Sequence, residues 1–158
     1  MIRTLTEILA CVAILANAVV YGTDVFGATV LRPAIAAVDD RTLTQLLGHV
    51  HRIADRRFAA IGAFGLIAAV AMAALCAASG RWVSAVAAAV ATLALVVFLA
   101  VYTRVSKPVN AALTAAAVAD RVPDDVRGLQ ARWDSVINAR VALQGTALVA
   151  LCIGLAAV

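Results

Sequence analysis

Four runs of predominantly apolar residues are the feature that most constrains the fold of this chain. They cover residues 6–31, 58–78, 82–103 and 136–158, and about 20 helical residues are enough to cross a hydrocarbon core about 30 Å thick. Hydrophobic residues make up 65% of the 158-residue chain and charged residues only 14%, against about 45–50% and about 25% in soluble domains. The sequence therefore predicts an all-α integral membrane protein, with residues 1–158 forming a single four-helix transmembrane bundle.

The first run carries a polar stripe. Asn17, Tyr21 and Asp24 are spaced i, i+4 and i+7, so on a helix they share one face. A carboxylate facing lipid is costly, and we therefore expect Asp24 to turn toward other helices or a wet cavity. Two interpretations stay open: a structural carboxylate satisfied by Tyr21, a neighbouring hydroxyl or Arg32, and a titrating or substrate-facing group.

Basic residues predict the orientation in the membrane. Eleven of the thirteen Lys and Arg residues lie in the two long connections and the helix ends beside them, and only Arg3 and Arg81 lie on the other side. The positive-inside rule then places both long connections in the cytoplasm and both termini outside the cell membrane. The arginines are dispersed among aspartates, which argues against nucleic acid as a partner.

The first long connection predicts an amphipathic helix. Pro33 is expected to end or kink the first helix, and Asp39 and Asp40 to cap a new one. This helix either lies at the interface or continues into the second span. Its apolar positions fall in one wide stripe at helical spacing: Leu43, Leu46, Leu47, Val50, Ile53, Ala54 and Phe58.

Two histidines lie in this helix. His49 and His51 would point about 200° apart on a helix, so they cannot clamp one ion. We therefore expect no cofactor, and a haem or a metal ion bound at these two histidines is the alternative. His51 is four residues before Asp55, whose carboxylate would orient and stabilise the ring. Either the segment is an interfacial helix with solvated charges, or His51 is an acid–base group facing the mouth of the bundle.

The second long connection contributes three further candidates. Pro108 fits the first turn of a helix that includes Asn110. Trp133 and Arg140 are seven residues apart and share one helical face. Trp133 is interpreted as an anchor in the membrane-interface belt, and an inward Arg140 is a ready partner for an anion or for Asp24.

Short motifs in both halves give the chain a family resemblance. The motifs are G-T-D-V-F-G-A-T-V-L-R-P from Gly22 to Pro33, H-R-I-A-D-R-R from His51, P-V-N-A-A-L from Pro108, and W-D-S-V-I-N-A-R-V-A-L from Trp133. Over nearly its whole length the chain resembles the anthrone oxygenase-like family of small four-helix membrane proteins. The resemblance implies oxygenation of an activated aromatic of the anthrone or phenol type, without metal or flavin.

Such chemistry needs a base, stabilisation of an oxyanion and an apolar cavity. The expected catalytic residues are His51 or Asp24 as base and Arg140 and Asn110 as anion stabilisers. The expected substrate-binding residues are Asn17, Tyr21, Phe26, Trp133 and Asp55. The alternative is a non-enzymatic accessory subunit or small carrier. The expected partners are the lipid bilayer and a hydrophobic small molecule, and a homo-oligomer or a second membrane protein is also compatible with the sequence.

Overall fold

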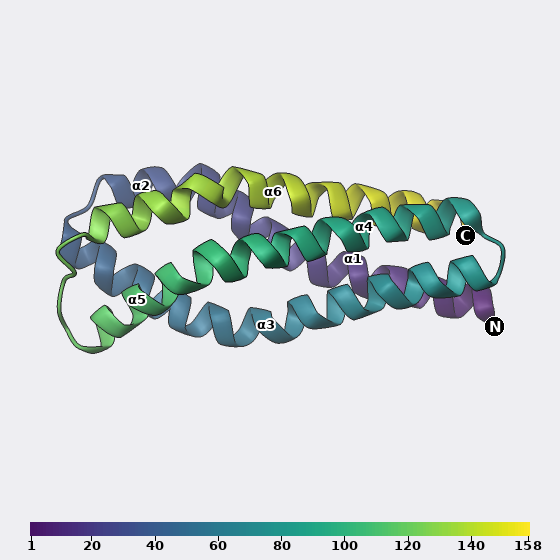
Figure 1. The fold of residues 1–158 in the computed structure, drawn as a ribbon, viewed down its shortest axis with the longest axis horizontal. Helices are drawn as coiled ribbons and strands as arrows, with labels where there is room; N and C mark the ends of the chain where they lie inside the picture. The colour runs from purple at the N-terminus through teal and green to yellow at the C-terminus, as the bar shows by residue number, and fades with distance from the viewer. The chain divides into compact units, whose positions relative to one another are not determined.

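The computed structural model describes all 158 residues and is helical almost throughout, without strands (Figure 1). Four continuous helical stretches, Ile2–Ala36, Asp40–Ala78, Trp82–Val118 and Val126–Ala156, are long and apolar enough to cross a membrane. The predicted all-α fold with four transmembrane helices is confirmed. The elements are α1 (Ile2–Phe26), η1 (Gly27–Leu31), α2 (Arg32–Ala36), α3 (Asp40–Ala78), α4 (Trp82–Val101), η2 (Tyr102–Ser106), α5 (Lys107–Val118) and α6 (Val126–Ala156).

Two π-helical turns, η1 and η2, directly precede the prolines of the first and third helical stretches and let each helix continue. Pro33 lies in the first turn of α2 and Pro108 in the first turn of α5, directly after these wider turns. A proline ring crowds the carbonyl four residues back and removes one donor, and a π turn relieves both by shifting the hydrogen bonds to i→i−5. The first helix therefore continues through Pro33 to Ala36 instead of ending there.

The chain divides into two compact units, each built from segments of all four stretches. Unit 1 comprises Met1–Gly22, Ala60–Phe98 and Ala142–Val158, and unit 2 comprises Thr23–Ala59 and Leu99–Val141.

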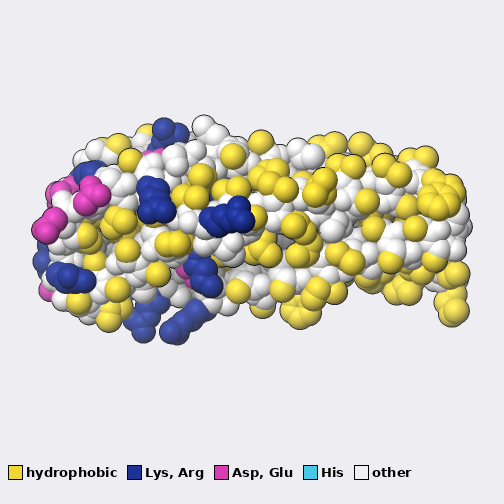
Figure 2. Space-filling model, in the orientation of Figure 1, with side chains coloured by type: hydrophobic (Ala, Val, Ile, Leu, Met, Phe, Trp, Pro, Cys, Tyr) yellow, Lys and Arg dark blue, Asp and Glu magenta, His cyan; other side chains and the backbone are white.

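Unit 1 has the character of a membrane-embedded bundle. Its core consists mostly of alanines, with Met72 and Leu151 fully buried among them. Small residues let helices approach closely: a Cβ on Gly65 would lie 3.1 Å from the Cβ of Ala16. Large apolar side chains such as Leu15 and Phe64 point outward, and the surface formed by this unit is hydrophobic in Figure 2. An apolar exterior over an apolar core is what a lipid environment requires.

Unit 2 carries nearly all of the charge, which Figure 2 shows gathered over its surface. Eleven of the thirteen Lys and Arg residues belong to it. Its core is built from larger side chains: Ile35, Leu43, Leu47, Val109, Leu113, Val126, Trp133 and Ile137.

α3 begins at the predicted cap. The backbone N–H of Thr42 donates to Asp39 Oδ1 at 2.7 Å, and its hydroxyl donates to Oδ2 at 3.1 Å. These hydrogen bonds lower the pKa of Asp39. From there α3 runs unbroken to Ala78, so the amphipathic segment continues into the second span.

The wide apolar stripe of α3 is divided between interior and surface. Leu43 and Leu47 are buried, whereas Leu46, Val50 and Ile53 are 46%, 41% and 55% exposed. The stripe is broader than the helices of unit 2 can cover, and its outer part stays exposed.

Candidate functional site

A buried ion pair joins two helices of unit 2. Arg140, from α6, donates to both carboxylate oxygens of Asp24, from α1, at 2.6 and 3.2 Å. Its remaining guanidinium nitrogen, Nη1, donates to the hydroxyl of Ser106, from η2, at 2.8 Å. Both charged side chains are more than nine-tenths buried. Asp24 turns inward as expected, and each ion satisfies the other in a region of low polarity.

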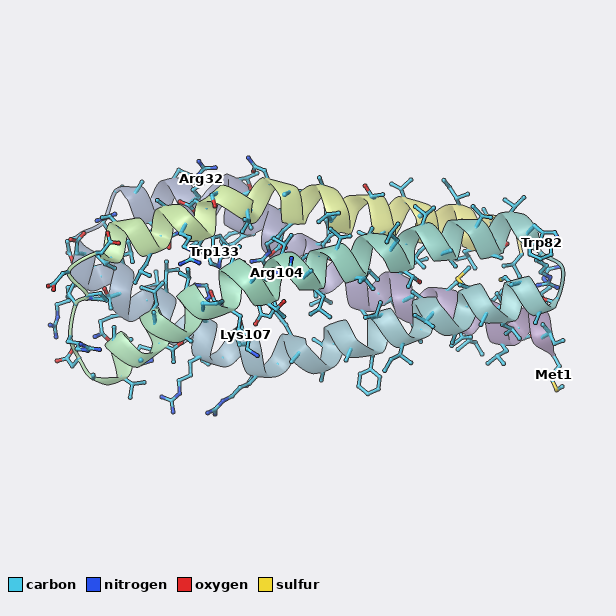
Figure 3. All side chains as sticks on the ribbon, in the orientation of Figure 1. Met1, Arg32, Trp82, Arg104, Lys107 and Trp133 are labelled. Atoms are coloured by element: carbon cyan, nitrogen blue, oxygen red, sulfur yellow. The ribbon has the colours of Figure 1, made fainter.

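Arg140 is the partner of Asp24, and the alternative partner Arg32 points elsewhere. Arg32 lies 3.8 Å from Asp134 with its side chain 47% exposed, and Figure 3 shows it projecting from the outside of the helix. Asp24 and Arg32 are eight residues apart in sequence, and the wider turn η1 between them rotates the later residues relative to a regular α-helix.

A second carboxylate, the half-buried Asp55, is held by neutral donors. Its Oδ1 accepts from the hydroxyl of Tyr102 at 2.8 Å and from Nδ2 of Asn110 at 2.9 Å. The expected hydrogen bond between Asp55 and His51 is absent, because Asp55 faces η2 and α5 instead. Tyr102, Ser106 and Asn110 are spaced by four residues and all contribute to the site.

Tyr102 and Ser106 were not among the residues expected from the sequence. Their spacing in the sequence could have indicated them, since Tyr102 and Ser106 precede Asn110 by eight and four residues and so fall on nearly the same helical face. The sequence does not show, however, that Arg140 and Asp55 face this helix. A Tyr and a Ser near the end of a span are then expected to be ordinary interfacial residues.

Trp133 lies between the ion pair and His51. Its ring centroid is 5.9 Å from that of His51, and the guanidinium carbon of Arg140 stands 5.2 Å from the Trp133 ring, within reach of a cation–π interaction. Figure 3 shows Trp133 extending from α6 into unit 2. The prediction of an interfacial belt anchor is wrong, because the side chain is buried among the helices.

A small cavity of about 10 Å³ opens beside this tryptophan. Three polar atoms of its lining residues are buried without a hydrogen-bond partner: Nε2 of His51, Nε1 of Trp133 and Oε1 of Gln130. The space accommodates about one water molecule. Its other lining residues are Gly27, Leu31, Arg32 and Leu47.

The cavity offers complementary hydrogen-bonding groups. The Trp133 N–H donates, the Gln130 carbonyl accepts, and an imidazole nitrogen does either according to its protonation. A water molecule or a substrate hydroxyl that reached these atoms would satisfy them, and buried polar groups left unsatisfied are costly. Gln130, like Tyr102 and Ser106, was not expected from the sequence.

The predicted anion stabilisers are committed to other partners. Arg140 directs its guanidinium nitrogens to Asp24 and Ser106, and Asn110 donates to Asp55. Neither residue lines the cavity, and both link helices of unit 2. The buried donor without a protein partner next to His51 is Nε1 of Trp133.

Three of the expected substrate-binding residues are not part of this cluster. Asn17 and Tyr21 belong to unit 1, where the Asn17 amide donates to the backbone carbonyl of Gln144 at 3.0 Å and the Tyr21 ring lies against Gly145. Phe26 is 53% exposed because it is two residues after Asp24 and so points to the opposite side of the helix. Of the three aromatic residues expected to bind substrate, only Trp133 lies at the site, where the ring of Tyr102 is also 5.8 Å from the guanidinium carbon of Arg140.

His49 and His51 face different environments. His49 is exposed on α3 and His51 is buried, as their two-residue spacing on a helix requires. No group of three or more His, Cys, Asp or Glu side chains is arranged to hold a metal ion.

Comparison of the chain with models of known protein families, with curated proteins and with solved structures gives no match. The resemblance to the anthrone oxygenase-like family stays a prediction, and inference about function rests on the side chains of unit 2.

Proposed function

We propose that this protein is a membrane enzyme that oxygenates activated aromatics of the anthrone or phenol type without metal or flavin, at the cavity beside His51. The observation that supports the proposal most directly is the buried His51 Nε2, which has no protein partner. A general base must present such a nitrogen to its substrate.

The chemistry balances without an external reductant. His51 takes a proton from the acidic methylene of an anthrone-type substrate, leaving a carbanion whose charge is delocalised onto the ring oxygen. This electron-rich anion reduces O₂ and forms a C–O bond, and the resulting substrate hydroperoxide loses water to leave a carbonyl. One CH₂ group and one O₂ become one C=O group and one H₂O.

The neighbouring side chains supply the electrostatics. The Trp133 N–H is placed to donate to the substrate oxygen as its negative charge develops. Arg140 lies over the same indole ring and is fixed there by Asp24 and Ser106. Gln130 would accept a hydrogen bond from a substrate hydroxyl, which favours phenolic substrates.

The present cavity admits only the polar edge of such a substrate. Pockets for drug-sized ligands measure about 300–1,000 Å³, compared with about 10 Å³ here. Entry of the ring requires lining side chains to move, and Arg32, whose side chain is 47% exposed, is the most exposed of them.

The test is O₂ uptake by the purified protein with an anthrone as substrate. We expect His51→Ala to lower the rate by about 10²–10⁴-fold, the usual contribution of a general base. His49→Ala is the matched control, since it removes an exposed histidine two residues away on the same helix. Equal turnover by His51→Ala and wild type overturns the proposal.

A non-enzymatic accessory subunit or small carrier is the second candidate. It is favoured by the closed packing of unit 2, in which Asp24, Asp55 and Asp134 already accept hydrogen bonds from other side chains of the chain. Stoichiometric co-purification of another membrane protein, together with no O₂ uptake, would support it over the enzyme.

For the orientation we propose a cytoplasmic unit 2, with both termini outside the cell membrane. The support is the concentration of Lys and Arg residues in unit 2. A cysteine introduced at Ser135, which is exposed, in a variant whose three native cysteines (Cys11, Cys76 and Cys152) are replaced by alanine, should react with a membrane-impermeant thiol reagent only after the cells are opened. Labelling in intact cells would reverse the assignment.

A further inference from the structure

Three arginines on the outer face of α3 form a cationic surface that the proposed oxygenation does not use. Arg52, Arg56 and Arg57, together with His49 and Ile53, line a depression of about 380 Å³. All five side chains are exposed. We propose that this arginine surface binds the headgroup phosphate of an anionic phospholipid of the phosphatidylglycerol type.

The charge of the arginine surface is not neutralised within the chain. Elsewhere in unit 2, Arg41 pairs with Asp120 and Arg127 with Asp40, each at 2.7 Å. None of the three arginines of this surface makes an ion pair.

The nearest carboxylate in sequence, Asp55, does not neutralise the surface either. It accepts its hydrogen bonds from Tyr102 and Asn110, which lie on other helices of unit 2. Three guanidinium groups within six residues therefore remain available to an external anion, and guanidinium matches the geometry of phosphate oxygens.

The place of this surface along α3 points to a lipid headgroup as the anion. Residues 58–78, which follow Arg57 directly, contain no charged side chain and form the apolar half of the helix. The surface from His49 to Arg57 extends about 12 Å along the axis, and the headgroup layer is about 5–8 Å deep on each side of a bilayer. A helix that enters the membrane at Phe58 thus brings these arginines to the depth of the phosphates.

Apolar side chains beside the arginines favour a phospholipid over a free phosphate ion. Ile53 lies within the depression and is 55% exposed, and Val50, on the same side of α3, is 41% exposed. A basic helix with adjoining apolar residues is typical of segments that bind anionic membrane surfaces. Figure 3 shows long side chains with nitrogen ends projecting outward from α3.

The test is native mass spectrometry of the full chain in detergent, titrated separately with dioleoylphosphatidylglycerol and dioleoylphosphatidylcholine. We expect wild type to bind the anionic lipid at least about tenfold more tightly. Arg52→Gln/Arg56→Gln/Arg57→Gln should bind both lipids equally. If the triple variant does not fold, the single variant Arg56→Gln replaces it in the test. Its affinity for the anionic lipid is expected to fall about fivefold.

The matched control neutralises three other exposed arginines of unit 2 that make no ion pair: Arg104, Arg121 and Arg132. This variant carries the same net charge and should keep the preference for the anionic lipid. Equal loss in both triple variants would mean that net charge alone attracts the lipid, and it overturns the proposed site. Displacement of the lipid by an equimolar amount of inorganic phosphate overturns it as well, because the surface would then recognise a free anion.

Discussion

Replacing Arg140 by methionine should destabilise unit 2 more than any other single change to its polar residues. The substitution leaves the Asp24 carboxylate, whose side chain is 3% exposed, without its cation and without the two hydrogen bonds it accepts. Removing one member of a buried ion pair costs about 3–5 kcal/mol.

For a chain of this size each kcal/mol corresponds to about 2–4 °C in Tm. The expected loss is therefore about 6–20 °C in thermal unfolding of the detergent-solubilised protein. The double variant Asp24→Leu/Arg140→Met should recover most of it, because replacing both ions with apolar groups removes the uncompensated charge.

Arg132→Met is the control, since Arg132 is an exposed residue of the same helix and should leave the Tm within about 1–2 °C. A loss below about 3 °C for Arg140→Met would refute the reasoning. So would a double variant as unstable as the single one, because the cost would then come from lost packing and not from an unpaired ion.

Three further predictions follow from the same structure. Gly48→Ala should lower the Tm by several degrees, because a Cβ there would collide with Ala117 and the backbone of Leu113; Gly62→Ala, on the same helix with nothing within 4 Å, should not. Asp39→Ala should lower the Tm at neutral pH through loss of the helix cap. Hydrogen bonding lowers the pKa of Asp39, so its contribution is complete above the ordinary pKa of 3.8 and is lost as the pH falls through the lowered value; the Tm difference between wild type and Asp39→Ala should therefore shrink in acid. Trp133→Phe keeps an aromatic ring and removes the N–H, so it should lower O₂ uptake about 10²-fold, and an unchanged rate would exclude the indole N–H as an oxyanion donor.

The sequence by itself determined the class of the protein, the number of long helices and the inward turn of Asp24. Each of these follows from a local property: the length of an apolar run, or the cost of placing one carboxylate in lipid. The cap at Asp39 is local in the same sense, because the side chain and the N–H it accepts from are three residues apart.

Only the tertiary structure decided which groups meet. Asp24 and Arg140 are separated by 116 residues, and Arg32 was an equally charged and much nearer candidate. The choice between them depends on how far η1 rotates the chain after Asp24 and on which face of α6 turns inward, and neither is a property of a single segment. The same holds for Asp55, which binds Tyr102 and Asn110 in place of His51, and for Trp133, which packing removes from the surface. The packing of all the helices together decides which residues far apart in sequence become partners. Helical periodicity within one segment does not say which other segment its faces will meet.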